Sequence, residues 1–251
     1  MKRYGLIGKK LGHSFSKTFF SEYFDRHSIH ASYENIELPD LDGIREKLVG
    51  FDGFNVTIPY KEAVIPFLDE IDSIAKEIGA VNTVKIAGDK WIGYNTDAFG
   101  FHQSIKPFLT NRHERAIVFG TGGASKAICY ILDKIGVDII QISRSPEVVQ
   151  FAYEDVNEIM VSNCKLIVNT TPVGMFPNID DCIDLSFDDL GEDHLVVDLI
   201  YNPEKTLLLR KAEEKGSAVL NGASMKSDSI TQLNILLTEP DTIWRCKYSI
   251  R

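Results

Sequence analysis

The chain has 251 residues, 44% of them hydrophobic, which is enough for one large domain or two small ones with a sizeable core. Its formal net charge of −9 argues against nucleic acid as a partner. The four cysteines form no CxxC pair and indicate no metal site, and neither a signal peptide nor a bilayer-spanning apolar run is present. We therefore expect reduced thiols, a cytoplasmic protein and no membrane partner.

The first hundred residues predict a mixture of strands and helices. Short apolar runs and apolar residues at spacings of three and four distinguish the two. The predicted strands are 4–8, 32–38, 53–58, 81–86 and 91–94, and the predicted helices are 15–24, 41–49, 60–64, 71–78 and 97–109. Gly88-Asp89 joins the last two strands and is typical of a hairpin.

Residues 116–119 predict a buried strand that ends in the glycine-rich turn Gly120-Thr121-Gly122-Gly123-Ala124-Ser125. Apolar spacing then predicts a helix that ends at Gly136. A strand, glycine turn and helix in this order bind a pyrophosphate through the helix N-terminus. Ser125 stands at the last position of the strict GxGxxG fingerprint, so an ordinary tight turn is the alternative interpretation.

The next strand, 137–142, is followed by Ser143-Arg144-Ser145. An NAD site carries an acidic residue about 20 residues past the glycines to bind the ribose 2′-hydroxyl, and here no acid is present. Arg144 between two hydroxyls suits a 2′-phosphate, which predicts NADP rather than NAD. The alternative is an ordinary solvated surface arginine.

Further apolar runs predict strands at 165–169, 195–200 and 218–220. Continuous apolar strands separated by helical or loop segments indicate a parallel sheet covered on both faces. Ligands bind such sheets at the carboxyl ends of the strands. The residues predicted to lie at those ends are Gly120, Arg144, Thr170, Tyr201 and Gly222.

Several separate stretches resemble the shikimate dehydrogenase family. In the first half they are His13-Ser14-Phe15-Ser16, Asn55-Val56-Thr57-Ile58-Pro59-Tyr60-Lys61-Glu62, Gly79-Ala80-Val81-Asn82-Thr83 and Tyr94-Asn95-Thr96-Asp97. In the second half they are Gly120 to Ser125, Asn169 to Met175, Asp198 to Pro203 and Gly222-Ala223-Ser224-Met225. These stretches follow the family's order and together are highly specific.

The resemblance implies an α/β fold of two domains. An N-terminal α/β substrate domain at 1–102, joined by 226–251, would precede a C-terminal Rossmann-type doubly wound parallel sheet at 103–225 that binds NADP. A C-terminal helix would return to the first domain. The implied reaction is the reversible reduction of 3-dehydroshikimate to shikimate with NADPH, a step of aromatic amino-acid (chorismate) biosynthesis.

The resemblance also assigns roles to individual residues. Lys61 would be the acid/base residue, paired with Asp97. The substrate-binding residues would be Ser14 and Ser16 for the carboxylate, Thr57, Asn82 and Asp97 for the ring hydroxyls, Tyr201 near the substrate, and Gln232. The cofactor-binding residues would be Gly120, Thr121, Gly122, Gly123, Ala124, Ser125, Ser143, Arg144, Ser145, Thr170, Leu199 and Gly222.

These residue types suit the chemistry, although each has a simpler interpretation. An ammonium can stabilise and protonate the oxygen left negative by hydride delivery, and short polar side chains discriminate a polyol by hydrogen bonds. Lys61 alone is more often a surface lysine, Asp97 a helix cap, and Asn82-Thr83 part of a turn. Spacing does not bring Lys61 to Asp97; only the resemblance implies their contact.

The sequence departs from the family after Met225. The family has a substrate-binding glutamine four residues on, where this chain has Ser229, and Gln232 follows three residues later. Two rival functions remain, namely a quinate/shikimate dehydrogenase that uses NAD and a non-catalytic Rossmann protein that senses NADP. The expected partner is a small-molecule substrate, and the expected assembly is a monomer or homodimer.

Overall fold

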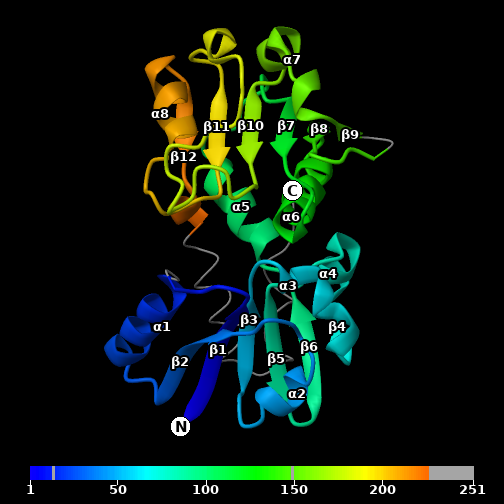
Figure 1. The fold of residues 1–251 in the computed structure, drawn as a ribbon, viewed down its shortest axis with the longest axis vertical. Helices are drawn as coiled ribbons and strands as arrows, with labels where there is room; N and C mark the ends of the chain where they lie inside the picture. The colour runs from blue at the N-terminus through cyan, green and yellow to red at the C-terminus, as the bar shows by residue number, and fades with distance from the viewer. Residues whose placement is uncertain (13–14, 148–149, 226–251) are drawn as a thin grey trace. The chain divides into compact units, whose positions relative to one another are not determined.

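The computed structural model describes residues 1–12, 15–147 and 150–225, shown in Figure 1. The described residues form two compact units, and the division falls between Asp97 and Ala98. Ser14, Gln232 and the expected C-terminal helix lie outside the described residues. No helix in the described part of the chain is long and apolar enough to cross a membrane.

A six-stranded mixed sheet forms the first unit, with the strand order β2-β1-β3-β5-β6-β4. β1 pairs in parallel with β2 and β3, β5 pairs antiparallel with β3 and β6, and β4 pairs in parallel with β6. The bounds are β1 Lys2–Gly8, β2 Ala31–Glu37, β3 Gly53–Val56, β4 Glu70–Ile71, β5 Thr83–Ala87 and β6 Lys90–Tyr94. The predicted hairpin around Gly88-Asp89 is therefore confirmed.

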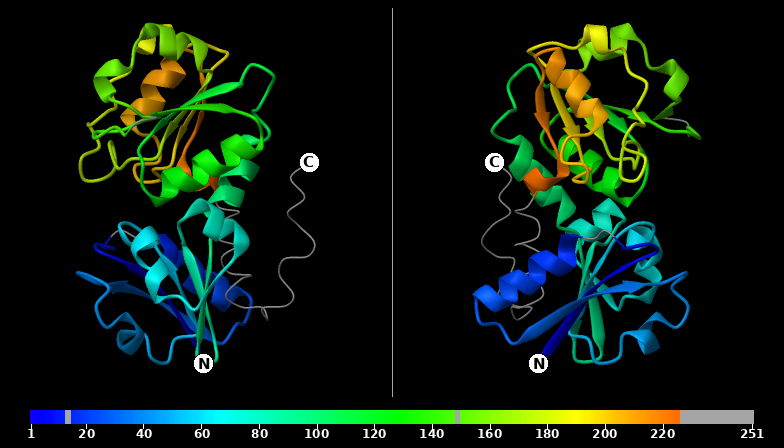
Figure 2. Two further views of the ribbon diagram at one scale, coloured as in Figure 1. Left: turned by 90° about the vertical axis from the view of Figure 1, so that its right-hand side faces the viewer. Right: turned by 60° about the vertical axis from the view of Figure 1, so that its left-hand side comes forward.

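Apolar side chains fix the helices of this unit against its sheet. α1 packs against β1 and β2 through a cluster that includes Phe20, Phe24 and Tyr33 (Figure 2). The helices are α1 Phe15–Arg26, α2 Ile44–Lys47, α3 Tyr60–Ala63, α4 Ser73–Ile78 and α5 Asp97–Ile105, with a 3₁₀ turn at Ile65–Phe67. α5 begins in the first unit and continues into the second.

Four predicted helices of this unit are shorter in the structure, α3 by a single residue, and local chemistry explains the clearest case. The helix predicted at 71–78 begins only at Ser73, because Ile71 pairs with β6 as part of an edge strand. Asp72 then caps the helix by accepting a hydrogen bond from the Ile74 N–H, and Gly79 ends it at φ +72°. The helices predicted at 41–49 and 97–109 shrink to α2 and α5.

The second unit contains a six-stranded sheet in which all pairs are parallel, with the order β12-β11-β10-β7-β8-β9. Its strands are β7 Arg115–Phe119, β8 Asp138–Ile142, β9 Gln150–Phe151, β10 Leu166–Asn169, β11 Leu195–Asp198 and β12 Ala218–Leu220. Its helices are α6 Gly123–Lys134, α7 Glu158–Asn163 and α8 Leu207–Glu214, with 3₁₀ turns at Tyr153–Asp155, Phe187–Asp189 and Gly222–Met225.

Helices cover both faces of this sheet, as the apolar strands predicted. Val161 of α7 and Leu208 of α8 pack in one cluster with Ile117 and Ile167, whereas alternate strand residues such as Val118 face the other side. The connections β7–α6–β8 and β11–α8–β12 run in opposite directions along the sheet. Right-handed crossovers place such helices on opposite faces, which is the doubly wound arrangement.

Candidate active site

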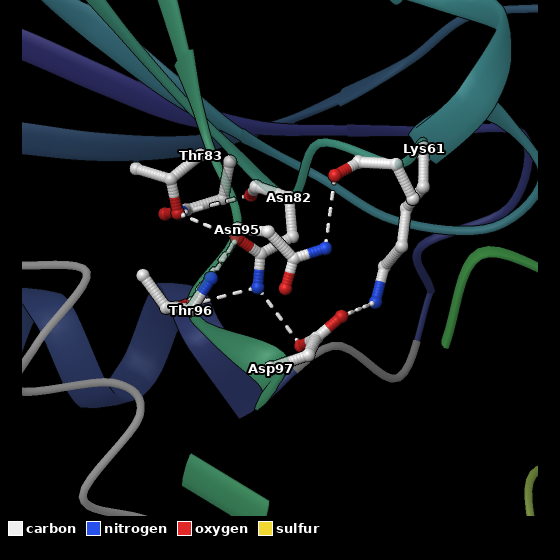
Figure 3. Close-up of polar contacts among 8 residues, drawn as sticks. Lys61, Asn82, Thr83, Asn95, Thr96 and Asp97 are labelled. Atoms are coloured by element: carbon white, nitrogen blue, oxygen red, sulfur yellow. Dashed lines mark hydrogen bonds and ion pairs between the residues drawn. The ribbon is translucent and has the colours of Figure 1, made fainter. Parts of the chain in front are cut away.

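A buried ion pair joins α3 to the start of α5 in the first unit. Lys61 Nζ lies 2.6 Å from Asp97 Oδ2, and the two side chains are only 15% and 12% exposed (Figure 3). The Lys61 carbonyl accepts the Val81 N–H at 2.7 Å, which fixes the backbone of α3 beside the β5 hairpin. The Asp97 carboxylate lies in the first turn of α5, where the helix dipole favours negative charge.

Asn82 holds the other oxygen of the same carboxylate. Its Nδ2 donates to Asp97 Oδ1 at 2.8 Å and to Thr96 Oγ1 at 2.9 Å (Figure 3). Its Oδ1 accepts the backbone N–H of Thr96 at 3.0 Å. Asn82 directly precedes β5 and is 2% exposed. Its buried amide therefore joins the start of β5 to Thr96 and Asp97, which follow β6.

Thr96 is absent from the sequence-predicted site, yet the structure places it in this cluster. A signal for it exists in the chain: the pair Asn82-Thr83 recurs as Asn95-Thr96 at the far end of the hairpin. Because Thr83 and Tyr94 are cross-strand partners, the two Asn-Thr pairs meet at one end of the ladder.

Two more predicted substrate residues leave the sheet at the same edge. β1 and β3 are parallel neighbours, with Ile7 opposite Val56, so the loops after them start side by side. Thr57 is half-buried there. Its carbonyl accepts the N–H of Tyr60, the residue directly before Lys61. Ser16 lies in the first turn of α1 and is partly exposed.

The glycine turn of the second unit requires its first glycine. Gly120 has φ +107°, and a Cβ there would lie 2.5 Å from Thr170 Oγ1. That threonine is held in place because its hydroxyl donates to the Phe119 carbonyl at 2.6 Å. Side-chain-free backbone at this point leaves room for a ligand to approach the turn closely.

The N-terminus of α6 lacks a side-chain cap. Gly122 is its N-cap residue, and a Cβ there would meet nothing within 4 Å. Ser125 is buried and donates its hydroxyl to the Gly120 carbonyl at 2.7 Å, so it does not cap the helix either. The N–H groups of the first turn of α6 have no partner within the helix. The glycine turn and this first turn, residues 120–125, therefore form a cradle that fits an anionic pyrophosphate.

Ser143, Arg144 and Ser145 lie beside that cradle. Phe119 and Ile142 are opposite each other on β7 and β8, so Gly120 and Ser143 leave neighbouring strands at the same edge. Ser143 is buried and accepts the Ser145 N–H at 3.1 Å, while Arg144 is exposed. The segment therefore places an exposed arginine after the strand that neighbours the glycine turn, and none of Ser143, Arg144 and Ser145 is acidic.

The remaining predicted cofactor residues also follow strands of this sheet. Thr170 follows β10, Leu199 follows β11, and a Cβ on Gly222 would lie only 2.1 Å from the Leu199 carbonyl oxygen. Tyr201 is 46% exposed. The carboxyl edge thus gathers the residues that the sequence placed there, and only glycine fits at position 222.

Asp198 is a buried carboxylate that organises the two loops around Thr170 and Leu199. It accepts hydrogen bonds from Asn169 Nδ2, the Ile200 N–H and Thr206 Oγ1, at 3.1, 3.0 and 2.7 Å. Burial raises the pKa of Asp198 to about 6, because desolvation penalises the ionised form more than these donors stabilise it. The sequence indicated no role for this carboxylate.

Fold and site together define a class of protein. It is a two-unit α/β protein whose second unit is a Rossmann-type sheet with a dinucleotide cradle, and whose first unit carries a lysine–carboxylate pair among short polar side chains.

Comparison with known proteins narrows this class. The family model of the shikimate dehydrogenase substrate binding domain matches residues 6–84. A relative from Staphylococcus haemolyticus named shikimate dehydrogenase (NADP(+)) is 40% identical over 238 residues, covering 89% of this chain and 87% of the relative. This chain therefore belongs to the shikimate dehydrogenase family.

Two solved structures show the same fold. Shikimate 5-dehydrogenase from Thermus thermophilus, in complex with NADP(H) and shikimate, has a TM-score of 0.83 and 29% identity, covering 94% of this chain and 94% of that chain. Quinate dehydrogenase from Corynebacterium glutamicum, in complex with NAD, has a TM-score of 0.83 and 27% identity, covering 94% of this chain and 93% of that chain.

Proposed function

We propose that this protein is an NADP-dependent shikimate dehydrogenase that reversibly reduces 3-dehydroshikimate to shikimate in aromatic amino-acid biosynthesis. The observation that carries the proposal is the contact of 2.6 Å between Lys61 Nζ and Asp97 Oδ2 in a nearly buried polar cluster. A structural ion pair has no need of the surrounding short polar side chains, whereas a ketone reductase needs a positioned proton donor among groups that recognise hydroxyls.

In the proposed mechanism Lys61 moves the proton. Its ammonium stabilises the negative charge that develops on the carbonyl oxygen of 3-dehydroshikimate and donates a proton from Nζ to that oxygen. Asp97 Oδ2 holds the ammonium in place during this step. In the oxidation of shikimate, the neutral amine accepts the proton from the hydroxyl at the same atom.

The same carboxylate can also bind the substrate. Among the described residues, each oxygen of Asp97 accepts one hydrogen bond, from Lys61 or Asn82, and a carboxylate offers about four lone-pair positions. Spare capacity therefore remains for a ring hydroxyl. We assign Thr57 and Asn82 to the other hydroxyls, with Asn82 giving up its bond to Thr96 Oγ1 when substrate binds. Ser14 and Ser16 are assigned to the carboxylate of the substrate, and Tyr201 and Gln232 to its surroundings.

NADPH is the cofactor of the proposed reaction, and the chemistry that it supplies when bound is hydride transfer to the carbonyl carbon. Residues 120–125 hold the pyrophosphate through N–H groups at the start of α6. Ser143, Arg144 and Ser145 hold the 2′-phosphate. Thr170, Leu199 and Gly222 bind the ribose and nicotinamide portion.

Initial rates of shikimate oxidation with NADP⁺ and with NAD⁺, repeated with quinate, test this function. We expect activity with shikimate and NADP⁺ to exceed the other three combinations, because Arg144 lies where an NAD site has its acid. Preference for quinate and NAD⁺ would favour the rival dehydrogenase. Binding of NADPH without turnover of 3-dehydroshikimate would favour a sensor.

The proposal also covers the domain organisation, the cellular location and the oligomeric state of the protein. Residues 1–102, joined by 226–251, form the substrate domain, and 103–225 form the NADP domain. The enzyme works in the cytoplasm as a monomer or homodimer on small-molecule substrates. Light scattering of the purified protein distinguishes the two assemblies, and truncation before residue 226 tests whether the last segment with Gln232 supports shikimate binding.

A further inference from the structure

Behind Asn82 a line of buried hydrogen bonds crosses the sheet of the first unit. The Tyr33 hydroxyl donates to Asn55 Oδ1 at 2.8 Å, Asn55 Nδ2 donates to Thr83 Oγ1 at 3.0 Å, and Thr83 Oγ1 donates to Asn82 Oδ1 at 3.1 Å. The exposed fractions of Tyr33, Asn55 and Thr83 are 3%, 3% and 0%. We call Tyr33, Asn55 and Thr83 the buried relay.

Two fixed groups set the orientation of the Asn82 amide. The Thr96 backbone N–H can only donate, and it lies 3.0 Å from one end of the amide. The Asp97 carboxylate accepts, and its Oδ1 lies 2.8 Å from the other end. The end facing Thr96 is therefore the oxygen and the end facing Asp97 is the NH₂ group.

The direction of every earlier bond follows from that orientation. Asn82 Oδ1 is an acceptor, so the single hydroxyl proton of Thr83 points at it. Thr83 Oγ1 then accepts from Asn55, which turns the Asn55 NH₂ group toward Thr83 and its oxygen toward Tyr33. The Tyr33 hydroxyl must donate, and burial raises the pKa of Tyr33 well above its ordinary value, which keeps that proton in place.

We infer that Tyr33 and Thr83 are positioning residues of the reaction, which act through Asn82 to hold the Asp97 carboxylate that in turn orients the Lys61 ammonium. This inference rests on the proposed function for the identity of the reaction. Neither residue needs to touch substrate. The Thr83 hydroxyl, which Asn55 and Tyr33 hold in turn, gives Asn82 Oδ1 a second donor beside the Thr96 N–H and so strengthens the orientation that Thr96 and Asp97 set.

Three variants test the inference through kcat and KM of shikimate oxidation with NADP⁺. Thr83→Val keeps the shape of the side chain but removes its hydroxyl, and we expect kcat to fall about 10-fold because Asn82 Oδ1 loses one donor and the amide is held less firmly against Asp97. Thr83→Ser restores the hydroxyl and should return kcat to within about 2-fold of wild type. Tyr33→Phe leaves Asn55 Oδ1 without its donor and should lower kcat about 3-fold.

A loss of general structure gives a different result. In that case KM for NADP⁺ and the melting temperature would change together with kcat, and the serine variant would not recover activity. We expect KM for NADP⁺ to stay within about 2-fold of wild type in all three variants. Wild-type kcat in both Thr83→Val and Tyr33→Phe, or no recovery in Thr83→Ser, overturns the inference.

Solvent exchange of the Asn82 side-chain amide protons, measured by NMR, provides a readout that needs no turnover. These protons are buried and donated to Thr96 Oγ1 and Asp97 Oδ1, so we expect slow exchange in wild type and in Thr83→Ser. Exchange should accelerate about 10-fold or more in Thr83→Val. If the wild-type protein is inactive with shikimate, the proposed function fails, and this exchange measurement still supports or overturns the relay.

Discussion

At the scale of single residues, substitution of Lys61 distinguishes a catalytic role of this side chain from a purely structural one. We expect Lys61→Ala to lower kcat by about two to four orders of magnitude with little change in KM for shikimate, because a positioned proton donor acts mainly in the transition state. Lys90→Ala is the matched control, since Lys90 pairs with Glu70 on the surface of the same unit. Near-normal kcat in Lys61→Ala would refute the catalytic role.

Arg144 carries the predicted preference for the phosphorylated cofactor. Charge-assisted bonds to a 2′-phosphate contribute roughly 1.5–3 kcal/mol, so Arg144→Ala should weaken NADPH binding about 10- to 150-fold and hardly change NADH binding. Fluorescence titration of the two cofactors measures both constants. Arg210→Ala changes another exposed arginine of the second unit and serves as the control. Equal losses for NADPH and NADH would argue against the phosphate contact.

At the scale of elements, one glutamine joins the glycine turn to the neighbouring strand. Gln141 on β8 donates from Nε2 to the Gly120 carbonyl and to Ser125 Oγ, each at 3.0 Å, and its Oε1 accepts from Gln150 Nε2. We expect Gln141→Leu to weaken NADPH and NADH binding by a similar factor of about 3 to 10, since it removes these bonds and the pyrophosphate is common to both cofactors.

The same fluorescence titration separates this effect from that of Arg144. Gln141→Glu keeps the length of the side chain but replaces the donating NH₂ group with an acceptor, so it should bind both cofactors as weakly as Gln141→Leu. A loss confined to NADPH would show that Gln141 acts through the Ser143–Ser145 turn rather than through the glycines.

Strands and helices were predictable where local pattern alone decides them. The apolar strands of the second sheet and the hairpin around Gly88-Asp89 appear where the sequence indicated. The two-residue strands β4 and β9 were not predictable, because edge pairing with a neighbour creates them rather than any periodicity. α2 begins only at Ile44, because Gly43 before it has φ +62°, a left-handed conformation that interrupts a right-handed helix.

For the candidate site, too, the sequence pattern does not predict contacts between residues that are far apart in the chain. Resemblance implied that Lys61 meets Asp97, but spacing could not, because 36 residues and three strands separate the two positions. Thr96 and the buried relay were missed for a related reason. Threonine and asparagine in a strand are chemically ordinary until the register of β3, β5 and β6 places them within hydrogen-bond distance.

At the scale of the whole molecule, buried ionisable groups of opposite type make stability depend on pH. Burial lowers the pKa of His113 and His194, so the unfolded chain binds more protons and stability is lost as pH falls below the usual histidine range. Asp198 acts in the reverse sense. Its folded pKa of about 6 exceeds the ordinary value of 3.8, so the folded state binds more protons between these values.

Asp198→Asn isolates the carboxylate contribution. Its stabilisation is fully present below pH 3.8 and is lost as pH rises through 6, by up to about 3 kcal/mol for a shift of this size. We therefore expect the unfolding free energy of wild type minus that of Asp198→Asn to fall by about 2–3 kcal/mol between pH 4 and pH 7. The histidine contributions cancel in this difference.

Urea unfolding followed by circular dichroism at several pH values measures both free energies. Asp180→Asn, which changes an exposed carboxylate of the same unit, should leave the corresponding difference nearly constant across this range. A wild-type minus Asp198→Asn difference that rises with pH would mean that the three donors to Asp198 outweigh its desolvation. The loops around Thr170 and Leu199 would then be held by an ionised carboxylate throughout the pH range.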